Sequence, residues 1–353
     1  MKFRFKIQQY QTDAVNSVVS VFKGQPYSDG VSYRRDLGEV KPGAEQVSLF
    51  DTGYLNEALQ LTDEQLLKNI RDVQQDNDIY QSASLAKGLG RCALDVEMET
   101  GTGKTYVYIK TMFELNKRYG WSKFIVVVPS IAIREGVKKS FEITVDHFME
   151  HYGKKARFFI YSSANLNQLD SFSADSGINV MIINTQAFAA RGEDARRIYM
   201  KLDAFRSRKP IDVIAATKPI LIIDEPQSVL GADKKNATRE KLKEFKPLFT
   251  LLYSATHRAD DIVNMVYRLD AMDAYNKKLV KKISVKGINQ HGSTATNGYL
   301  YLESIELSKG NPRARIGFDK KGVSGVKQVT QLVSDGFDIY QPVSYTHLTL
   351  PTT

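Results

Sequence analysis

The chain has 353 residues, 42% hydrophobic and 25% charged, which is typical of a globular protein of about two domains, and its formal charge of +9 suits a polyanionic partner without proving one. Cys92 is the only cysteine and the five histidines are scattered, so the sequence excludes an internal disulfide, a thiolate metal cluster and zinc-ligand spacing such as HExxH. No apolar run approaches the ~20 residues that cross a bilayer, and the first residues lack a signal-peptide core, so we expect a cytoplasmic protein without a membrane span.

The first part of the chain is interrupted by a segment of loop composition. Residues 24–60 are rich in glycine, proline, aspartate and serine, which predicts an irregular insertion that extends to about residue 90. Within it, a helix is predicted over Asp63–Val73. Thr62 and Gln65 form a capping box at its start, and apolar residues follow at helical spacing.

From residue 92 onward, short apolar runs alternate with helical patterns. This alternation predicts an α/β fold in which a mainly parallel sheet is covered by helices on both faces. The strands are expected at Cys92–Met98, Phe124–Val128, Arg157–Tyr161, Asn179–Ile183, Pro219–Ile223 and Phe249–Ser254. Between the first two strands, Lys104–Arg118 carries Tyr106, Ile109 and Phe113 at i, i+3 and i+7, which indicates an amphipathic helix.

The stretch METGTGKT joins the first strand to this helix and resembles a phosphate-binding loop. Gly103, Lys104 and Thr105 fit the pattern GxxxxGK[ST], whereas Met98 occupies the position of its first glycine. A chance glycine-rich turn is the alternative interpretation. The strand before the stretch and the helix after it favour the phosphate loop, because the mechanism needs backbone N–H groups at a helix N-terminus.

Each residue of the loop has an expected role. Gly101 and Gly103 let the backbone curl around phosphate oxygens, Lys104 neutralises the β- and γ-phosphates of ATP, and the Thr105 hydroxyl binds Mg²⁺. The predicted nucleotide-binding residues of the loop are Thr100, Gly101, Thr102, Gly103, Lys104 and Thr105.

Two acids follow a later strand directly. In PILIIDEPQ, residues 219–227, four apolar positions run into Asp224 and Glu225, at the edge of the sheet where α/β folds bind ligands. We expect Asp224 to hold Mg²⁺, usually through water, and Glu225 to orient and deprotonate the attacking water. A surface Asp-Glu turn is the alternative.

The last predicted strand ends in three small residues, two of which carry hydroxyl groups. Ser254, Ala255 and Thr256 follow the apolar run PLFTLLY, where they could contact the acidic motif on one side and a moving domain on the other. Alone, this motif is a weak signal. Three motifs in this order, each at a strand end, together indicate an ATP-driven motor.

After about residue 275 the pattern changes. KKLVKKISVKGI and GYLYLESIEL alternate apolar and polar residues, which predicts short antiparallel strands and a small β-rich segment over 276–340. The final stretch, 341–353, contains VSYTHLTLPT and resembles the in-frame translation of a sequencing adapter; a genuine short β-tail is the alternative. We therefore expect the natural coding sequence to stop being represented near Tyr340.

Together, these motifs resemble superfamily 2 helicase-like ATPases, whose first motif commonly reads TGxGKT without the leading glycine. DEPQ, which ends in Pro226 and Gln227, is similar to the Res subunit of type III restriction–modification enzymes, whereas DEAD and DEAH mark other branches. The stretches VVVPSIAIREGV, IINTQAF, YSATH and YRLDAMDAY are also similar to that subunit. The resemblance extends from the first residues to about residue 340.

The resemblance implies a RecA-like first motor domain over 1–275 and several further contacts. Gln11, in IQQYQTDAV, matches the glutamine that reads adenine, although an ordinary polar helix residue is the alternative. Gln227 and the Ser-Ala-Thr motif couple the ATP site to motion. The residues that match nucleic-acid backbone contacts are Pro129, Ser130, Arg134, Asn184, Thr185 and Gln186. Arg134 could equally be a solvated helix charge. The implied partners are double-stranded DNA and a methyltransferase subunit.

The same family has parts that these residues do not match. A second RecA-like domain supplies arginine fingers, worth roughly 10³–10⁵ in rate, and a PD-(D/E)xK nuclease lies further on. We expect a fragment that binds ATP but lacks full activity. Two alternatives remain: another superfamily 2 DNA or RNA translocase, and a nucleotide-binding module without turnover.

Overall fold

The computed structural model describes residues 5–38, 52–189, 196–231, 237–257, 262–281, 300–307, 310–322 and 325–337. The chain forms two compact units, Met1–Lys282 and Ile283–Thr353. The predicted tail over 341–353 lies outside the described residues.

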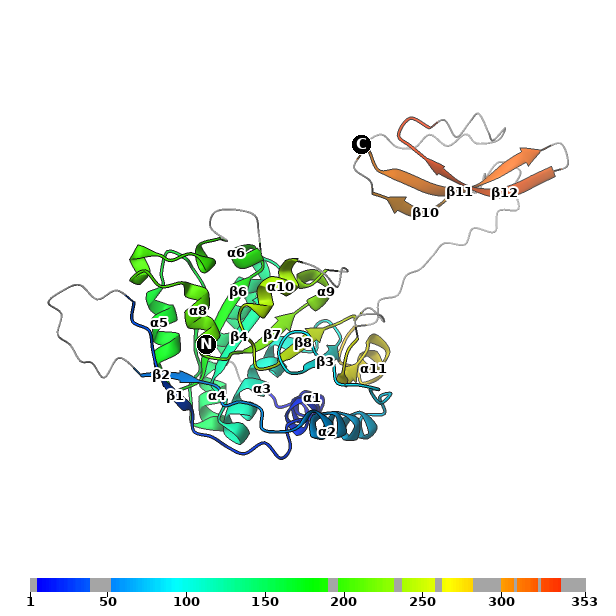
Figure 1. The fold of residues 1–353 in the computed structure, drawn as a ribbon. Coiled ribbons are helices and arrows are strands. Elements are labelled where there is room, and N and C mark those ends of the chain that lie inside the picture. The colour runs from blue at the N-terminus through cyan, green and yellow to red at the C-terminus, as the bar shows by residue number, and fades with distance from the viewer. Residues whose placement is uncertain are drawn as a thin grey trace. The chain divides into compact units, whose positions relative to one another are not determined.

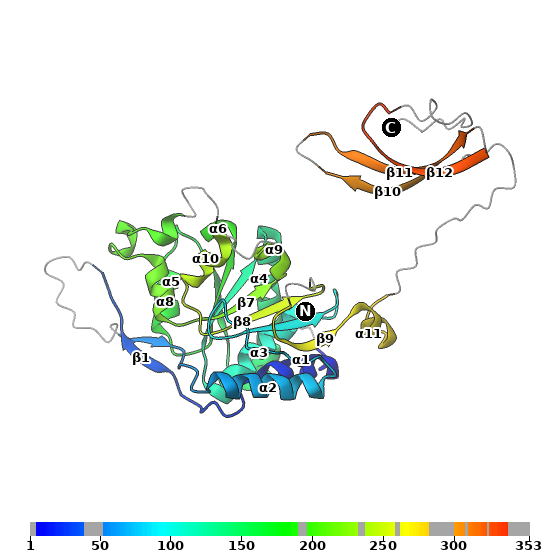
Figure 2. The same cartoon turned by 45° about the vertical axis from the view of Figure 1, so that its right-hand side comes forward.

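The first unit is built on a seven-stranded sheet in which every pairing is parallel, in the order β5-β6-β4-β7-β8-β3-β9 (Figures 1 and 2). Its strands are β3 (Ala93–Met98), β4 (Lys123–Val128), β5 (Arg157–Ile160), β6 (Asn179–Asn184), β7 (Ile220–Asp224), β8 (Thr250–Ser254) and β9 (Met265–Leu269). The predicted α/β class and the first six strands are confirmed. The edge strand β9 is not among the predicted strands.

Helices cover both faces of this sheet, as predicted (Figure 1). The face that includes Phe124 and Val126 packs against α1 (Gln9–Ser20), α2 (Asp63–Asp76), α3 (Lys104–Tyr119) and α4 (Ile131–Tyr152). The face that includes Ile125 and Val127 packs against α5 (Asn167–Ala174), α6 (Gln186–Ala189), α8 (Pro210–Ala216), α9 (Pro226–Val229) and α10 (Ala237–Lys243). No helix in the described ranges is long and apolar enough to span a bilayer.

The capping box predicted for α2 is confirmed. The Thr62 side chain accepts a hydrogen bond from the Gln65 backbone N–H at 3.2 Å, and the Gln65 side chain accepts one from Thr62 at 2.8 Å. Two of the helix's otherwise unpaired donors are thereby satisfied. The helix runs to Asp76, three residues beyond the predicted end.

The apolar stripe predicted for α3 is too narrow. Tyr106 is only partly buried, whereas Val107, Tyr108 and Met112 are completely buried together with Ile109. The reason is tertiary: α3 contacts β8 of the sheet and is flanked by α1 and α4, so more than one of its faces is covered. Helical spacing alone cannot predict how many neighbours a helix has.

Residues 24–60, of which 39–51 lie outside the described residues, contain two short strands that were not predicted. Val31–Arg34 (β1) and Thr52–Leu55 (β2) pair in antiparallel register. The segment is tied to the sheet by Asn56, which is buried and donates to the backbone carbonyl of Lys123 at 2.8 Å while accepting from the Ser122 N–H at 2.8 Å. Backbone groups at the start of β4 are therefore satisfied by this asparagine.

Lys123 is completely buried at the start of β4, and burial lowers the pKa of its ammonium to about 7. The ammonium donates to the carbonyl of Phe172 at 2.7 Å and to that of Asp175. Above pH 7 the unfolded chain binds a proton that the folded chain releases, so stability rises with pH up to the ordinary lysine pKa. From pH 7 to pH 9 the free energy of unfolding should rise by roughly 2 kcal/mol more in the parent chain than in Lys123→Met.

Urea unfolding at the two pH values measures this difference. Lys139→Met removes an exposed lysine, and its free energy of unfolding should rise between the two pH values by as much as that of the parent chain. An equal rise in the free energy of unfolding from pH 7 to pH 9 in Lys123→Met and in the parent chain would contradict the prediction.

The second unit contains a three-stranded antiparallel sheet of β10 (Leu300–Glu306), β11 (Arg313–Gly322) and β12 (Gly325–Val333). The strand predicted in GYLYLESIEL is β10. In KKLVKKISVKGI, residues 277–281 form no strand because they follow the end of α11 (Ala271–Asn276), and the remainder lies outside the described residues. Ile316 and Phe318 form the centre of this unit's small core.

Candidate functional site

The glycine-rich stretch forms a tight turn between β3 and α3. Gly101 and Gly103 have φ angles of 83° and 91°, which favour glycine. The Thr102 N–H and hydroxyl both donate to the Glu99 carbonyl, at 3.2 and 2.6 Å, and close the turn. A buried strand, a glycine turn and a helix N-terminus therefore follow one another as a phosphate loop requires.

Gln11 lies against this turn although it comes from α1. Its buried amide donates to the Thr102 carbonyl at 3.0 Å, and the Tyr10 hydroxyl donates to the same carbonyl at 3.0 Å. A Cβ atom at Gly103 would lie 2.6 Å from the Gln11 amide nitrogen, so a side chain at this position would displace the Gln11 amide. Gln11 is thus not a solvated helix residue; its contact with adenine stays a prediction.

The two acids lie across the sheet edge from the turn. Asp224 ends β7 and is 6% exposed, and Glu225 follows with a left-handed φ of 54° before α9. Strand β8 separates β7 from β3, so the two motifs are two strand spacings apart, roughly 10 Å. Lys104 spans this gap: its Nζ lies 2.6 Å from Glu225 Oε1.

The two acids have opposite electrostatic surroundings. Burial raises the pKa of Asp224 to about 6; Lys104 opposes this shift and Glu225 adds to it. Burial alone would also raise the pKa of Glu225, but hydrogen bonds from Lys104 and Gln227 outweigh it and lower that pKa. Glu225 is therefore a weak base while Lys104 contacts it, and becomes more basic when Lys104 moves away.

Thr105 and Asp224, the predicted magnesium ligands, meet at a third side chain. The Tyr108 hydroxyl lies 3.5 Å from Asp224 Oδ2, and the Thr105 side chain, three residues earlier on α3, opposes the rise in the Tyr108 pKa that burial causes. A hydroxyl and a carboxylate supply the oxygen atoms that Mg²⁺ prefers, so the donor set fits the ion. Tyr108 is not among the predicted residues. Its position three residues after Thr105 on a helix is the signal that could have identified it.

The residues predicted to couple the site to motion contact Glu225. The Gln227 amide donates to Glu225 Oε2 at 2.5 Å. The Ser254 hydroxyl faces Glu225 Oε2 at 3.3 Å, the side-chain amide oxygen of Gln227 at 3.0 Å and the backbone carbonyl of Thr256 at 2.9 Å. A hydroxyl has one proton, so Ser254 can serve only one of these acceptors at a time. Ala255 lies in the turn between Ser254 and Thr256.

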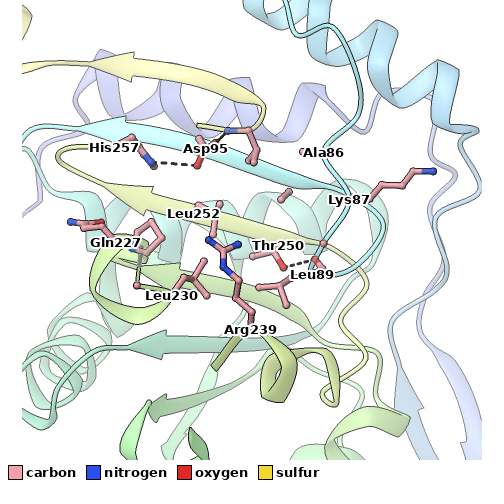
Figure 3. A pocket seen from close by; sticks show the side chains of 15 residues that line it. Ala86, Lys87, Leu89, Asp95, Gln227, Leu230, Arg239, Thr250, Leu252 and His257 are labelled. Carbon is pink, nitrogen blue, oxygen red and sulfur yellow. Dashed lines mark hydrogen bonds and ion pairs between the residues drawn. The ribbon is translucent and has the colours of Figure 1, made fainter. Parts of the chain in front are cut away.

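Behind these residues, on the sheet face covered by α9 and α10, lies a cavity of about 90 Å³ (Figure 3). Gln227 and His257 line it, but the glycine-rich turn does not. Asp95 of β3 is fully buried there: one carboxylate oxygen lies 3.4 Å from His257 Nδ1 and the other accepts from the Val263 N–H at 2.7 Å. Asp95, on the strand before the glycine turn, thus contacts His257 and Val263, which lie on either side of 258–262. In the sequence, an acid within an apolar strand is the feature that could have identified Asp95.

The six residues matched to nucleic-acid contacts gather at the ends of the adjacent strands β4 and β6. Arg134 donates to the Asn184 side chain at 3.4 Å, and the Thr185 hydroxyl donates to the Pro129 carbonyl at 3.2 Å. Asn184 also donates to Gln186 at 3.4 Å. These contacts link two segments that are about fifty residues apart.

Two of these side chains retain hydrogen-bonding capacity. The Ser130 hydroxyl oxygen accepts from the Ile133 N–H at 3.3 Å and caps α4, so its proton can be donated elsewhere. The buried Nε of Arg134 has no hydrogen-bond partner among the described residues.

Comparison with known proteins identifies relatives over most of the chain. The family model described as "Type III restriction enzyme, res subunit" matches residues 4–259. The EcoPI Res subunit of Escherichia phage P1 is 32% identical over 286 residues, which cover 72% of this chain and 29% of the relative. The EcoP15I Res subunit of Escherichia coli is 33% identical over 246 residues, covering 65% and 25%. The chain thus spans less than a third of the length of these relatives.

Solved structures show more distant likeness. The Sulfolobus solfataricus SWI2/SNF2 ATPase core in complex with double-stranded DNA has 15% identity and a TM-score of 0.31, covering 57% of this chain and 33% of that one. The DUF1998 helicase MrfA bound to DNA has 14% identity and a TM-score of 0.33, covering 74% and 34%.

Proposed function

The chain belongs to the family of type III restriction enzyme Res subunits, and from that membership we propose that residues 1–275 are the RecA-like, ATP-binding motor domain of such a subunit. The observation that carries the proposal is the 2.6 Å contact between Lys104 Nζ and Glu225 Oε1, which joins motifs 121 residues apart at one edge of the sheet. Residues 276–340 would lead into a second motor domain, and 341–353 would not be native.

In this proposal the glycine turn is already formed, and the Lys104 and Gln11 side chains move to contact ATP. The N–H groups of the turn and the Lys104 ammonium hold the phosphates, and the Gln11 amide exchanges the Thr102 carbonyl for the adenine edge. Thr105 and Asp224 would hold Mg²⁺, which would supply positive charge against the phosphate oxygens. Lys104 contacts Glu225, so a Lys104 ammonium that contacts the phosphates instead leaves Glu225 available to orient water and accept its proton.

The direct test is a titration of the chain with ATP and Mg²⁺, followed by a hydrolysis assay. Binding without turnover is expected, because arginine fingers would come from the second motor domain. Absence of binding would refute the proposal. In the whole protein, which we expect in the cytoplasm, a methyltransferase subunit would supply sequence recognition, and ATP hydrolysis would drive translocation or switching on double-stranded DNA before cleavage.

The surface around Arg134 is proposed to contact the DNA backbone. Arg134→Ala should weaken binding of double-stranded DNA by the same factor for unrelated sequences and reduce the slope of log K against log salt by about one. Fluorescence anisotropy at several salt concentrations measures both effects. Arg157→Ala removes an exposed arginine at the start of β5, away from this surface, and should leave the slope unchanged. Equal slopes for Arg134→Ala and the parent chain would contradict the assignment.

A further inference from the structure

Tyr108 is completely buried, yet its polar end reaches the nucleotide site. It lies on α3 one turn after Thr105, and its ring packs edge-on against the Tyr253 ring at a centroid distance of 5.5 Å. A buried tyrosine hydroxyl needs hydrogen-bond partners, and the polar side chains that act on this one are Asp224, at 3.5 Å, and Thr105, three residues earlier on the helix. Thr105 lies at the start of α3 and Asp224 at the end of β7, so Tyr108 is the side chain placed to connect them.

The direction of these hydrogen bonds determines what Tyr108 can do. Asp224 accepts at its Oδ2, so the Tyr108 hydroxyl donates to it; the distance of 3.5 Å is long for such a bond. The Tyr108 oxygen can then accept the proton of the Thr105 hydroxyl. With its proton directed to Tyr108, the Thr105 oxygen presents its lone pairs to a cation. The carboxylate is held in one orientation by the same hydroxyl.

We propose that Tyr108 is a positioning residue for the magnesium site, whose hydroxyl holds Thr105 and Asp224 in the orientation that Mg²⁺ requires. This proposal rests on the proposed ATP-binding function. It assigns Tyr108 no contact with ATP and no role in proton transfer. Without the hydroxyl, the Thr105 proton and the Asp224 carboxylate rotate independently, and both must be fixed when the ion binds.

The test compares Tyr108→Phe with Tyr119→Phe in the 353-residue chain. Both variants remove one buried hydroxyl from α3, but that of Tyr119 donates to the Val19 carbonyl at 2.9 Å, remote from the site. ATP binding is titrated in EDTA and again over a range of Mg²⁺ concentrations, and Tm is recorded. Tyr108→Phe should keep the EDTA affinity within about twofold and need roughly tenfold more Mg²⁺ to tighten binding, the size expected for losing a hydrogen bond to a charged group.

Tyr119→Phe should keep the Mg²⁺ dependence of the parent chain while its Tm falls by a similar amount. A parent-like Mg²⁺ dependence in Tyr108→Phe would overturn the positioning role and leave ATP binding intact. A parent chain that binds no ATP at all would overturn the proposed function together with this one. If Tyr108→Phe does not fold, Tyr108→Leu, which also lacks the hydroxyl, takes its place, and the same outcomes decide.

Discussion

Lys104→Ala is expected to abolish measurable ATP binding, with a loss of affinity of roughly 100-fold or more. The ammonium is the only side-chain cation that the glycine-rich turn offers to the phosphates among the described residues, and it is mostly buried beside Glu225. Removing it leaves Mg²⁺ as the only cation of the proposed site to offset the charge of the β- and γ-phosphates, which face Asp224 and Glu225. Isothermal titration calorimetry with ATP and Mg²⁺ measures the effect.

A matched control is available on the same helix. Lys110→Ala removes a half-buried lysine whose Nζ contacts the Thr12 hydroxyl at 2.9 Å, away from the turn. This variant should bind ATP like the parent chain. If Lys104→Ala bound ATP with parental affinity, the turn would not be a phosphate loop, and the proposed function would fail with it.

Glu225→Gln should retain ATP binding but reduce hydrolysis by roughly 10²–10⁴-fold in a longer protein that includes the second motor domain. The amide has nearly the shape of the carboxylate and can keep the contacts with Gln227 and Ser254, but it cannot accept a proton from water. ATP affinity should be equal or modestly higher, because the neutral amide holds Lys104 less tightly. Steady-state phosphate release and ATP titration separate the two effects.

Glu97→Gln provides the comparison for this prediction. Glu97 is an acid on β3 that pairs with Arg268 at 3.4 Å and contacts neither Lys104 nor Asp224 in the described interactions. Its replacement should leave turnover within about twofold. Undiminished turnover in Glu225→Gln would show that another group accepts the proton.

The family membership was readable from short motifs because each motif is local. TGTGKT, DEPQ and YSATH each need only a few consecutive residues after a buried strand, and the match to the Res family over residues 4–259 confirms the resemblance inferred from them. The strands behind these motifs were also predictable. Continuous apolar runs of five or six residues are the pattern of a strand buried on both faces.

Elements whose burial depends on neighbours were predicted less well. The edge strand β9 contains the exposed Arg268 and pairs only with β3, so its sequence lacks a continuous apolar run. β1 and β2 lie within residues 24–60, which composition predicted to be irregular; both strands are partly exposed and pair with each other. In each case the partner segment, not the local pattern, stabilises the strand.

By itself, the sequence determined the α/β class, the glycine turn before α3 and the presence of two acids at the end of a buried strand, because these follow from hydrophobic periodicity and turn chemistry within a few residues. Only the tertiary structure decided that β8 lies between β3 and β7, that Gln11 closes on Thr102, and that Lys104 contacts Glu225. It also decided that the Tyr108 hydroxyl lies between Thr105 and Asp224. These arrangements depend on strand order and on the packing of segments about a hundred residues apart, which no local pattern encodes.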